Sequence, residues 1–171
     1  MNSLSIFALT AVTALVCSLT NPIQSKAAET APELTPEAYT QEMIDSTETF
    51  ENTLFALINE ERARHGLNAY VLDETIDAAS EIRIFELEDV FSHNRNGGKR
   101  FSTILGDFGV SYTSASEIIA AGQTSPELVL QAWLNSPRHG ARILSSEYMK
   151  IGVAHDRTAD GTDYWEVLFI H

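Results

Sequence analysis

The sequence predicts an α+β domain in which helices pack on a small antiparallel sheet. Three observations carry this prediction. Apolar residues recur at helical spacing in several separate segments, two C-terminal segments are rich in strand-forming residues, and capping or turn residues divide these segments. The two predicted strands are residues 150–156 and 163–170, joined by a turn at Asp160 and Gly161. Helices that bury one face against such a sheet form a layered α+β domain.

The first half of the domain is predicted to contain two helices separated by a short extended segment. The first helix stops at Gly66, which can adopt the left-handed conformation, and residues 69–72 follow as the extended segment. Asp73 is a good N-cap for the second helix. The apolar positions at helical spacing are Phe50, Leu54, Leu57 and Ile58 in the first helix and Ile76, Ala79, Ile82 and Phe85 in the second.

The second half adds a short helix within residues 101–108 and a longer helix that starts at a capping box. Residues 124–127 place Ser125 before Pro126, and proline is favoured in the first helical turn. Pro137 is expected to end that helix. Four aromatic side chains are assigned to the core rather than to a ligand-stacking surface: Trp133, Tyr148, Trp165 and Phe169.

Residues 1–27 have the features of a secretory signal peptide. The apolar run over residues 6–19 is shorter than the ~20 residues of a transmembrane helix. Ser25 and Ala27 form a small-x-small cleavage site, which predicts a mature chain beginning near Ala28. Two alternatives stay open. The segment before the apolar run has no Lys or Arg, which favours a retained anchor, and Cys17 offers a lipid attachment point that the bulky residue before it disfavours.

Charge and cysteine content narrow the class of protein. The chain has a net charge of −13, and residues 28–51 contain seven carboxylates and no Lys or Arg. Residues 28–49 are therefore predicted to be an acidic spacer, part of which can be helical. The sequence has no basic stripe of the kind that binds nucleic acid. Cys17 is the only cysteine, so the exported domain, residues 50–171, is expected to be disulfide-free and stabilised by its core alone.

Five short segments of this domain follow one another in a recognisable order: residues 91–98, 117–123, 132–144, 151–153 and 164–165. Together they resemble the bacterial, SCP-like branch of the CAP superfamily, which is named after cysteine-rich secretory proteins, antigen 5 and pathogenesis-related protein 1. The resemblance covers roughly residues 50–171. It implies a three-layer α-β-α sandwich, a secreted, extracellular bacterial protein that can be associated with the cell envelope, and a central cleft lined by His and Glu.

The resemblance places His93, Glu117 and His139 in this cleft. His93 matches the first cleft histidine, Glu117 the glutamate of the Gly-Glu-Asn-Ile motif, and His139 the histidine of the bacterial Ser-Pro-Gly-His segment. Ser136 stands where eukaryotic members have a second glutamate, so the four-residue cleft set is incomplete. Arg138 replaces the usual glycine before His139, and Arg142 stands at a common asparagine position; both would place cations at the rim.

These residue types permit three kinds of site. Two neutral imidazoles and one carboxylate match a three-ligand zinc site, made by His93, His139 and Glu117, with water in the fourth position. Without a metal, either histidine could act as a general base with Glu117 as its orienting partner, but no serine lies in a recognisable nucleophile elbow and no catalytic residue can be assigned. Equally, the trio could be a structural network, with His93 just past a helix C-terminus and His139 capping the helix that contains Trp133.

The favoured function is a secreted binding module whose cleft recognises a lipid, a glycan or a protein. One alternative is a divalent-metal-dependent hydrolase that uses the same cleft, and another is a structural or interaction protein of the cell envelope. The incomplete ligand and nucleophile sets favour binding over catalysis. His65, His155 and His171 receive no site role. Nucleic acid and a stable membrane span after signal cleavage are not expected among the partners.

Overall fold

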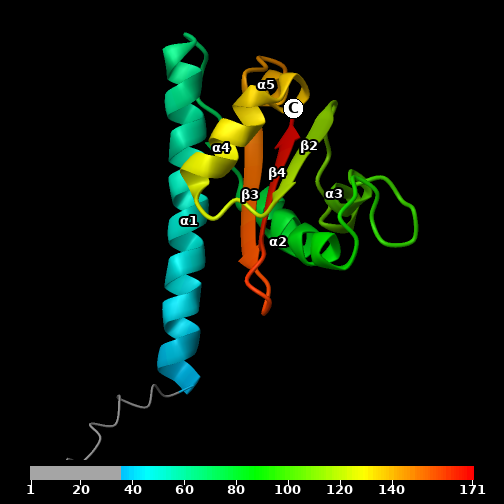
Figure 1. Ribbon diagram of the computed structural model, residues 1–171. Coiled ribbons are helices and arrows are strands. Elements are labelled where there is room, and N and C mark those ends of the chain that lie inside the picture. Colours follow the sequence, from blue (N-terminus) through cyan, green and yellow to red (C-terminus); the bar gives the residue numbers. More distant parts are fainter. Residues whose placement is uncertain (1–35) are drawn as a thin grey trace, which may run out of the picture. The chain divides into compact units, whose positions relative to one another are not determined.

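The computed structural model describes the backbone of residues 36–171 and the side chains of residues 50–171 (Figure 1). The predicted signal peptide and residues 28–35 of the predicted spacer lie outside the described residues. The elements, in chain order, are α1 (Pro36–Arg64), β1 (Val71–Leu72), α2 (Glu74–Asp89), α3 (Thr103–Asp107), β2 (Ala115–Ala121), α4 (Pro126–Asn135), α5 (Pro137–Ile143), β3 (Lys150–Arg157) and β4 (Asp163–Ile170).

The four strands form one sheet in the order β1-β3-β4-β2. β3 and β4 make the predicted antiparallel hairpin, and β2 pairs antiparallel with the other side of β4, with Glu117 opposite Leu168. The short β1 pairs in parallel with β3, so the sheet is antiparallel except at this edge. Parallel neighbours need a long crossover connection, and here α2 and the elements after it lie between β1 and β3.

The sheet is covered on both faces, which gives the three layers of an α-β-α sandwich (Figure 1). On one face, side chains of α1, α4 and α5 pack with alternate residues of β2, β3 and β4; this core includes Leu54, Trp133, Ile143 and Trp165. On the other face, α2 and α3 pack with the intervening residues of the strands. The alternation follows from the two-residue period of a strand.

The structure confirms the predicted residues that start or end helices and the predicted turn between the last two strands. Gly66, two residues after the last residue of α1, adopts φ 69°. The Asp73 carboxylate accepts hydrogen bonds from the backbone N–H groups at the start of α2. Ser125 caps α4 with Pro126 in the first turn, and Gly161 has φ 87° in the β3–β4 turn. Each of these signals is local, so a few adjacent residues suffice to specify it.

Of the four apolar positions that predicted α2, Ile76 and Ala79 are buried, but Ile82 and Phe85 are 46% and 56% exposed. At 100° per residue these positions lie about 240° and 180° around the helix from Ile76, away from the sheet. The face that packs on the sheet instead contains two polar residues, Ser80 and Arg83, both fully buried. A charged residue therefore occupies a core position of this helix.

Two elements were not predicted, and both border the cleft. Residues 115–121, which received no assignment, form β2. Pro137 ends α4 as predicted but also begins α5, so His139 lies within a helix and does not cap α4. Gly140 allows the close approach of the two helices, because a Cβ at this position would lie 3.2 Å from the Leu134 carbonyl oxygen.

Across residues 36–171, no helix combines the length and apolar composition needed to cross a membrane.

Candidate functional site

An open cleft of about 700 Å³ lies beside β2. Because β2 has only one neighbouring strand, β4, it forms an edge of the sheet. Three segments line the cleft: the loop residues His93, Arg100 and Phe101, residues 115–118 of β2, and the α5 residues Pro137, Arg138, His139, Ala141 and Arg142. Its volume falls within the range of small-molecule sites, about 300–1,000 Å³.

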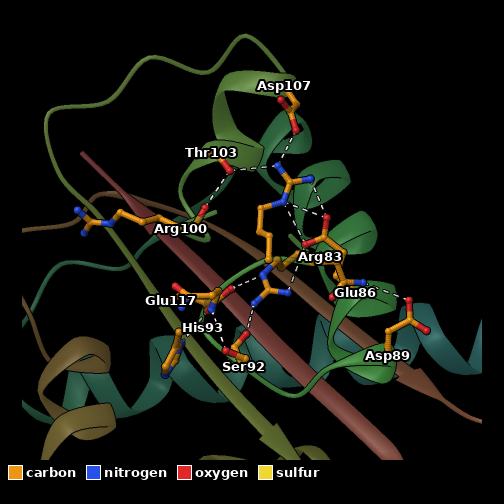
Figure 2. A network of polar contacts seen from close by, with 12 residues as sticks. Arg83, Glu86, Asp89, Ser92, His93, Arg100, Thr103, Asp107 and Glu117 are labelled. Atoms are coloured by element: carbon orange, nitrogen blue, oxygen red, sulfur yellow. Dashed lines mark hydrogen bonds and ion pairs between the residues drawn. The ribbon is translucent and has the colours of Figure 1, made fainter. Parts of the chain in front are cut away.

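Glu117 links the cleft to the buried layer between β2 and α2 (Figure 2). Its side chain is fully buried, with one oxygen 2.8 Å from the Nε of Arg83 and the other 2.7 Å from the Nδ1 of His93. Arg83 is also fully buried and donates to the carbonyl of Ser92, next to His93 in the chain. A buried carboxylate is tolerated only when such partners compensate for its lost hydration.

The contact with Glu117 determines how His93 faces the cleft. An ionised carboxylate only accepts hydrogen bonds, so the Nδ1 of His93 carries the proton and donates it to Glu117. The Nε2 atom of His93 is then the ring nitrogen available to a ligand. Since the His93 side chain is 56% exposed, this atom belongs to the open part of the site.

The loop over residues 93–101 is held in place by a second ion-pair cluster. Arg95 contacts Glu86 on α2, with a shortest N···O distance of 2.7 Å, and Asp107 on α3 at 2.6 Å. These two carboxylates raise the pKa of Arg95, chiefly through the hydrogen bond from Arg95 to Glu86. Gly97 and Gly98 have φ values of 89° and 80°, which allow the tight return of the loop. His93 and Arg100 are therefore presented from an anchored loop.

His139 reaches the cleft from α5, on the side opposite the loop. Burial lowers the pKa of His139, and the nearby His93 and Arg138 lower it further. His139 is consequently neutral at pH 7 and can either donate or accept a hydrogen bond. His93, Glu117 and His139 all line this one cleft, so the structure brings together the three residues assigned to it.

A second buried glutamate, Glu166 on β4, lies behind Glu117. It is fully buried, and burial followed by the charge of Glu117 raises the pKa of Glu166 well above its usual value. Ser80 and Arg83 act in the opposite direction. Neither carboxyl oxygen of Glu166 forms a hydrogen bond with another described residue, and the Ser80 hydroxyl also lacks one, so Ser80 stabilises the ionised form of Glu166 only weakly. Burial and the charge of Glu117 thus both favour the protonated form of Glu166, while Arg83 pairs with Glu117.

The remaining predicted residues have clear positions. Ser136 lies between α4 and α5 and is not among the residues that line the cleft. Arg138 and Arg142 do line it, as expected of rim cations. His155 is buried, with its Nε2 atom 2.9 Å from Asp163. The cleft residue that sequence reasoning missed is Arg100; the adjacent pair Lys99 and Arg100 on a glycine-rich loop was the available signal.

The arrangement does not fit the zinc set of His93, His139 and Glu117 as it stands. Both oxygens of Glu117 are engaged, one by Arg83 and one by His93. Within the described side chains, no group of three or more His, Cys, Asp or Glu residues is placed to hold a metal ion. Zinc binding by the trio stays a prediction, and it would require Glu117 to exchange partners. In this arrangement a ligand meets the anchored imidazole of His93, the neutral His139 and the cleft arginines.

Comparisons with known proteins agree with this fold. The family model described as CAP, the cysteine-rich secretory protein family, matches residues 55–169. The uncharacterized protein YkwD of Bacillus subtilis (strain 168) is 33% identical over 128 residues, covering 73% of this chain and 48% of that protein. The chain thus spans about half the length of this relative. An uncharacterized protein of Borreliella burgdorferi is 29% identical over 132 residues, covering 76% of this chain and 83% of that protein.

Two solved bacterial structures are similar over most of the chain. An outer surface protein from Borrelia burgdorferi superposes with a TM-score of 0.65 at 27% identity, covering 70% of this chain and 90% of that one. An extracellular protein containing a SCP domain, from Bacillus anthracis, has a TM-score of 0.69 at 25% identity, covering 82% of this chain and 45% of that one. The family match extends over most of the α-β-α sandwich and all segments that build the cleft. The chain therefore belongs to the cysteine-rich secretory protein (CAP) family.

Proposed function

We propose that this protein is an extracellular binding module that takes its ligand in the cleft beside β2. The observation that carries the proposal is the anchored polar lining of a ligand-sized cavity. His93 is fixed through Glu117 to the fully buried Arg83, and the facing wall is the short helix α5. Side chains held in place before binding lose little freedom when a ligand arrives, which favours recognition.

Binding is favoured over turnover by the state of the polar groups. Glu117 is buried and already neutralised by Arg83, so it orients His93 rather than serving as a free base. Ser116 lines the cleft, yet its hydroxyl has no histidine partner among the described residues to activate it. Nucleophilic catalysis needs a nucleophile and a base within hydrogen-bond reach of one another.

An extracellular location is supported by the names of the similar structures, one an outer surface protein and the other an extracellular protein. The predicted signal peptide over residues 1–27 agrees with this location. A domain with no cysteine of its own depends on its apolar core for stability outside the cell, where many small domains rely on disulfides.

A structural role for the network is the second candidate. Arg83 joins Glu117 on β2 to the carbonyl of Ser92, and thereby fastens the loop to the sheet and to α2. Such a network can serve stability alone, with the cleft as a by-product of the helix and loop positions. The two candidates differ in whether cleft atoms respond to added ligands.

The test is an amide and imidazole NMR titration of the purified full-length protein with chemically distinct probes. We choose Zn²⁺, octanoate, chitobiose and inorganic phosphate, so that metal, lipid, glycan and anion chemistry are each represented. The binding-module proposal expects saturable shifts at His93, Ser116 and His139 with at least one probe. Ala141→Trp, which would fill the mouth of the cleft from an exposed position on α5, should abolish those shifts.

Two results would overturn the proposal. If none of the four probes shifts the cleft signals, the structural role is the better account. If the protein turns over an ester or glycoside substrate, and Glu117→Gln abolishes turnover while the fold survives, the cleft is an active site. Zn²⁺ that shifts both histidines together would support the metal-binding form of the module.

A further inference from the structure

We propose that the cleft binds a phosphate ester group, held by Arg100, Arg138 and Arg142. The inference rests on the proposed function, because it names the chemistry of the ligand in the same cleft.

The first argument is the contrast between the charge of the cleft and that of the chain. The chain has a net charge of −13. The Arg, Lys, Asp and Glu residues that line the cleft are three arginines and Glu117, a net of 3 − 1 = +2 before the histidines are counted. Glu117 is in addition paired with Arg83 directly behind it, at 2.8 Å. The cleft is therefore a concentrated positive site on an acidic protein, and low-dielectric walls strengthen such a local field.

The second argument is that the cleft arginines are the cations left without carboxylates. Elsewhere in the described part of the chain, a carboxylate lies within ion-pair distance of Arg64, Arg83, Arg95, Lys150 and Arg157. Arg62 is buried and donates to backbone carbonyls. The cations that have no carboxylate partner among residues 50–171 are Lys99, Arg100, Arg138 and Arg142, of which all but Lys99 line the cleft. Carboxylates are plentiful in this chain, so their absence from these three arginines leaves the guanidinium donors free for a ligand.

The third argument is placement. Arg138 and Arg142 are four residues apart on α5 and so share one side of that helix. Arg100 comes from the opposite wall, where its backbone is paired with Asn94 in the anchored loop. Figure 2 shows the Arg100 guanidinium pointing away from the Arg83 network, with no contact to it. Arg142 gives one N–H to the Tyr148 hydroxyl at 3.1 Å, which steadies the side chain and leaves its other donors free.

The composition of the site favours phosphate over a simple carboxylate. A carboxylate carries one charge and is satisfied by one bidentate guanidinium, whereas a phosphate ester carries up to two charges and presents three oxygens. Three arginines and two imidazoles around one cavity match the larger charge and the larger number of acceptors. Phe101 and Pro137, which are at least partly exposed, supply apolar walls for the organic part of an ester.

The experiment is titration of the purified full-length protein with inorganic phosphate, glycerol 3-phosphate and acetate at low ionic strength, by calorimetry and NMR. We expect phosphate and its ester to bind at the cleft at least about tenfold more tightly than acetate. Arg100→Gln, Arg138→Gln and Arg142→Gln should each weaken phosphate binding by about tenfold, the usual effect of losing a charge-assisted hydrogen bond. Lys99→Gln is the matched control, since it removes the same charge beside Arg100 but outside the cleft, and should change affinity less than about twofold.

A second arm separates the sources of the phosphate group. The protein is sedimented with phosphatidylcholine vesicles that contain or lack phosphatidic acid, whose headgroup is a phosphate monoester with three terminal oxygens. Sedimentation that needs phosphatidic acid and is lost in Arg138→Gln identifies a lipid headgroup, whereas binding of glycerol 3-phosphate without sedimentation identifies a soluble ester. Both results support the proposal.

The proposal is overturned if phosphate leaves the cleft signals unchanged, if acetate binds equally well, or if the arginine variants bind as the Lys99→Gln control does. Its failure is distinguishable from failure of the binding-module proposal. If octanoate, chitobiose or Zn²⁺ shifts the cleft signals and phosphate does not, the module stands and the phosphate assignment falls. If no probe shifts them, both fall.

Discussion

The two faces of the sheet are stabilised in different ways. The face under α1, α4 and α5 buries Trp133, Trp165 and Phe169 in a continuous apolar core. The face under α2 buries Arg83 and Glu166 together with the side chain of Glu117. β2 contributes to both, because alternate residues of a strand point to opposite faces.

This difference shows how the protein divides stability from recognition. Apolar burial stabilises the first face by about 25 cal/mol for each Å² removed from water. The buried charges of the second face roughly balance their own dehydration cost and add little net stability. Their role is to position the cleft residues, because Glu117 orients His93 and Arg83 holds the loop through the Ser92 carbonyl. The cleft accordingly opens where the polar layer reaches the sheet edge.

The largest loss of stability is expected from a substitution in the apolar core on the first face of the sheet. Trp133→Ala should lower the free energy of unfolding by about 3–5 kcal/mol, because it removes a side chain that is 1% exposed and leaves a cavity. Leu128→Ala, on the same helix but 49% exposed, is the control and should cost less than about 0.5 kcal/mol. Urea unfolding measures both. Equal effects of the two variants would show that this face is not the main source of stability.

A substitution in the buried polar layer on the second face should lower the free energy of unfolding somewhat less. Arg83→Met removes the buried partner of Glu117 and should lower stability by about 3 kcal/mol, since a buried carboxylate is left uncompensated. Adding Glu117→Gln to this variant should recover a large part of the loss, because the neutral amide is easier to bury. Denaturant unfolding of the two single variants and the double variant measures the coupling. Additive losses would contradict the pairing.

The same contrast explains which parts could be predicted from the sequence. The caps at Asp73 and Ser125 and the stop at Gly66 depend on neighbouring residues and were correctly predicted. The apolar core was also largely predictable, because Trp133 and Trp165 follow the rule that large apolar side chains are buried.

The polar layer could not be predicted from periodicity. Arg83 occupies a core position of α2, and its partner Glu117 lies 34 residues away, so no local pattern joins them. β2 alternates Glu117 and Ile119 with Ile118 and Ala120, and burial of both faces hides the usual strand signal. His93, Glu117 and His139 were grouped by family resemblance alone; their spacing in the chain contains no geometric information.

A smaller effect is expected when the titrating carboxyl of Glu166 is replaced on the polar face. The pKa of Glu166 is raised by burial and by Glu117, so the native state holds a proton that the unfolded state releases above its usual pKa of 4.5. Stability therefore falls as the pH rises above 4.5. Glu166→Gln keeps the shape without the titration and should raise the melting temperature at pH 8 by about 4 °C or more. At pH 4, where both side chains are neutral, the two melting temperatures should nearly coincide; a loss of stability at both pH values would contradict a neutral Glu166.

The smallest effect tests whether the polar layer extends to the far end of α2. Burial, reinforced by the neighbouring carboxyl of Asp156, raises the pKa of Glu88 to about 7. A raised carboxyl pKa means that the native state binds more protons than the unfolded state between pH 4.5 and 7, so this residue makes stability decline across that window and level off above it. Glu88→Gln should flatten that part of the pH–stability profile.

Because the Glu88 side chain is partly exposed, solvent screening should hold the gain at pH 8 below about 1 kcal/mol. Urea unfolding from pH 4 to 8 measures the profile, with Glu147→Gln as a control at an exposed position outside α2. A profile for Glu88→Gln that runs parallel to that of the control would confine the carboxyls with raised pKa to Glu166 and to Asp77, near the start of α2. The polar face would then be a compact cluster behind the cleft, built to position His93, and the rest of α2 would resemble an ordinary surface helix.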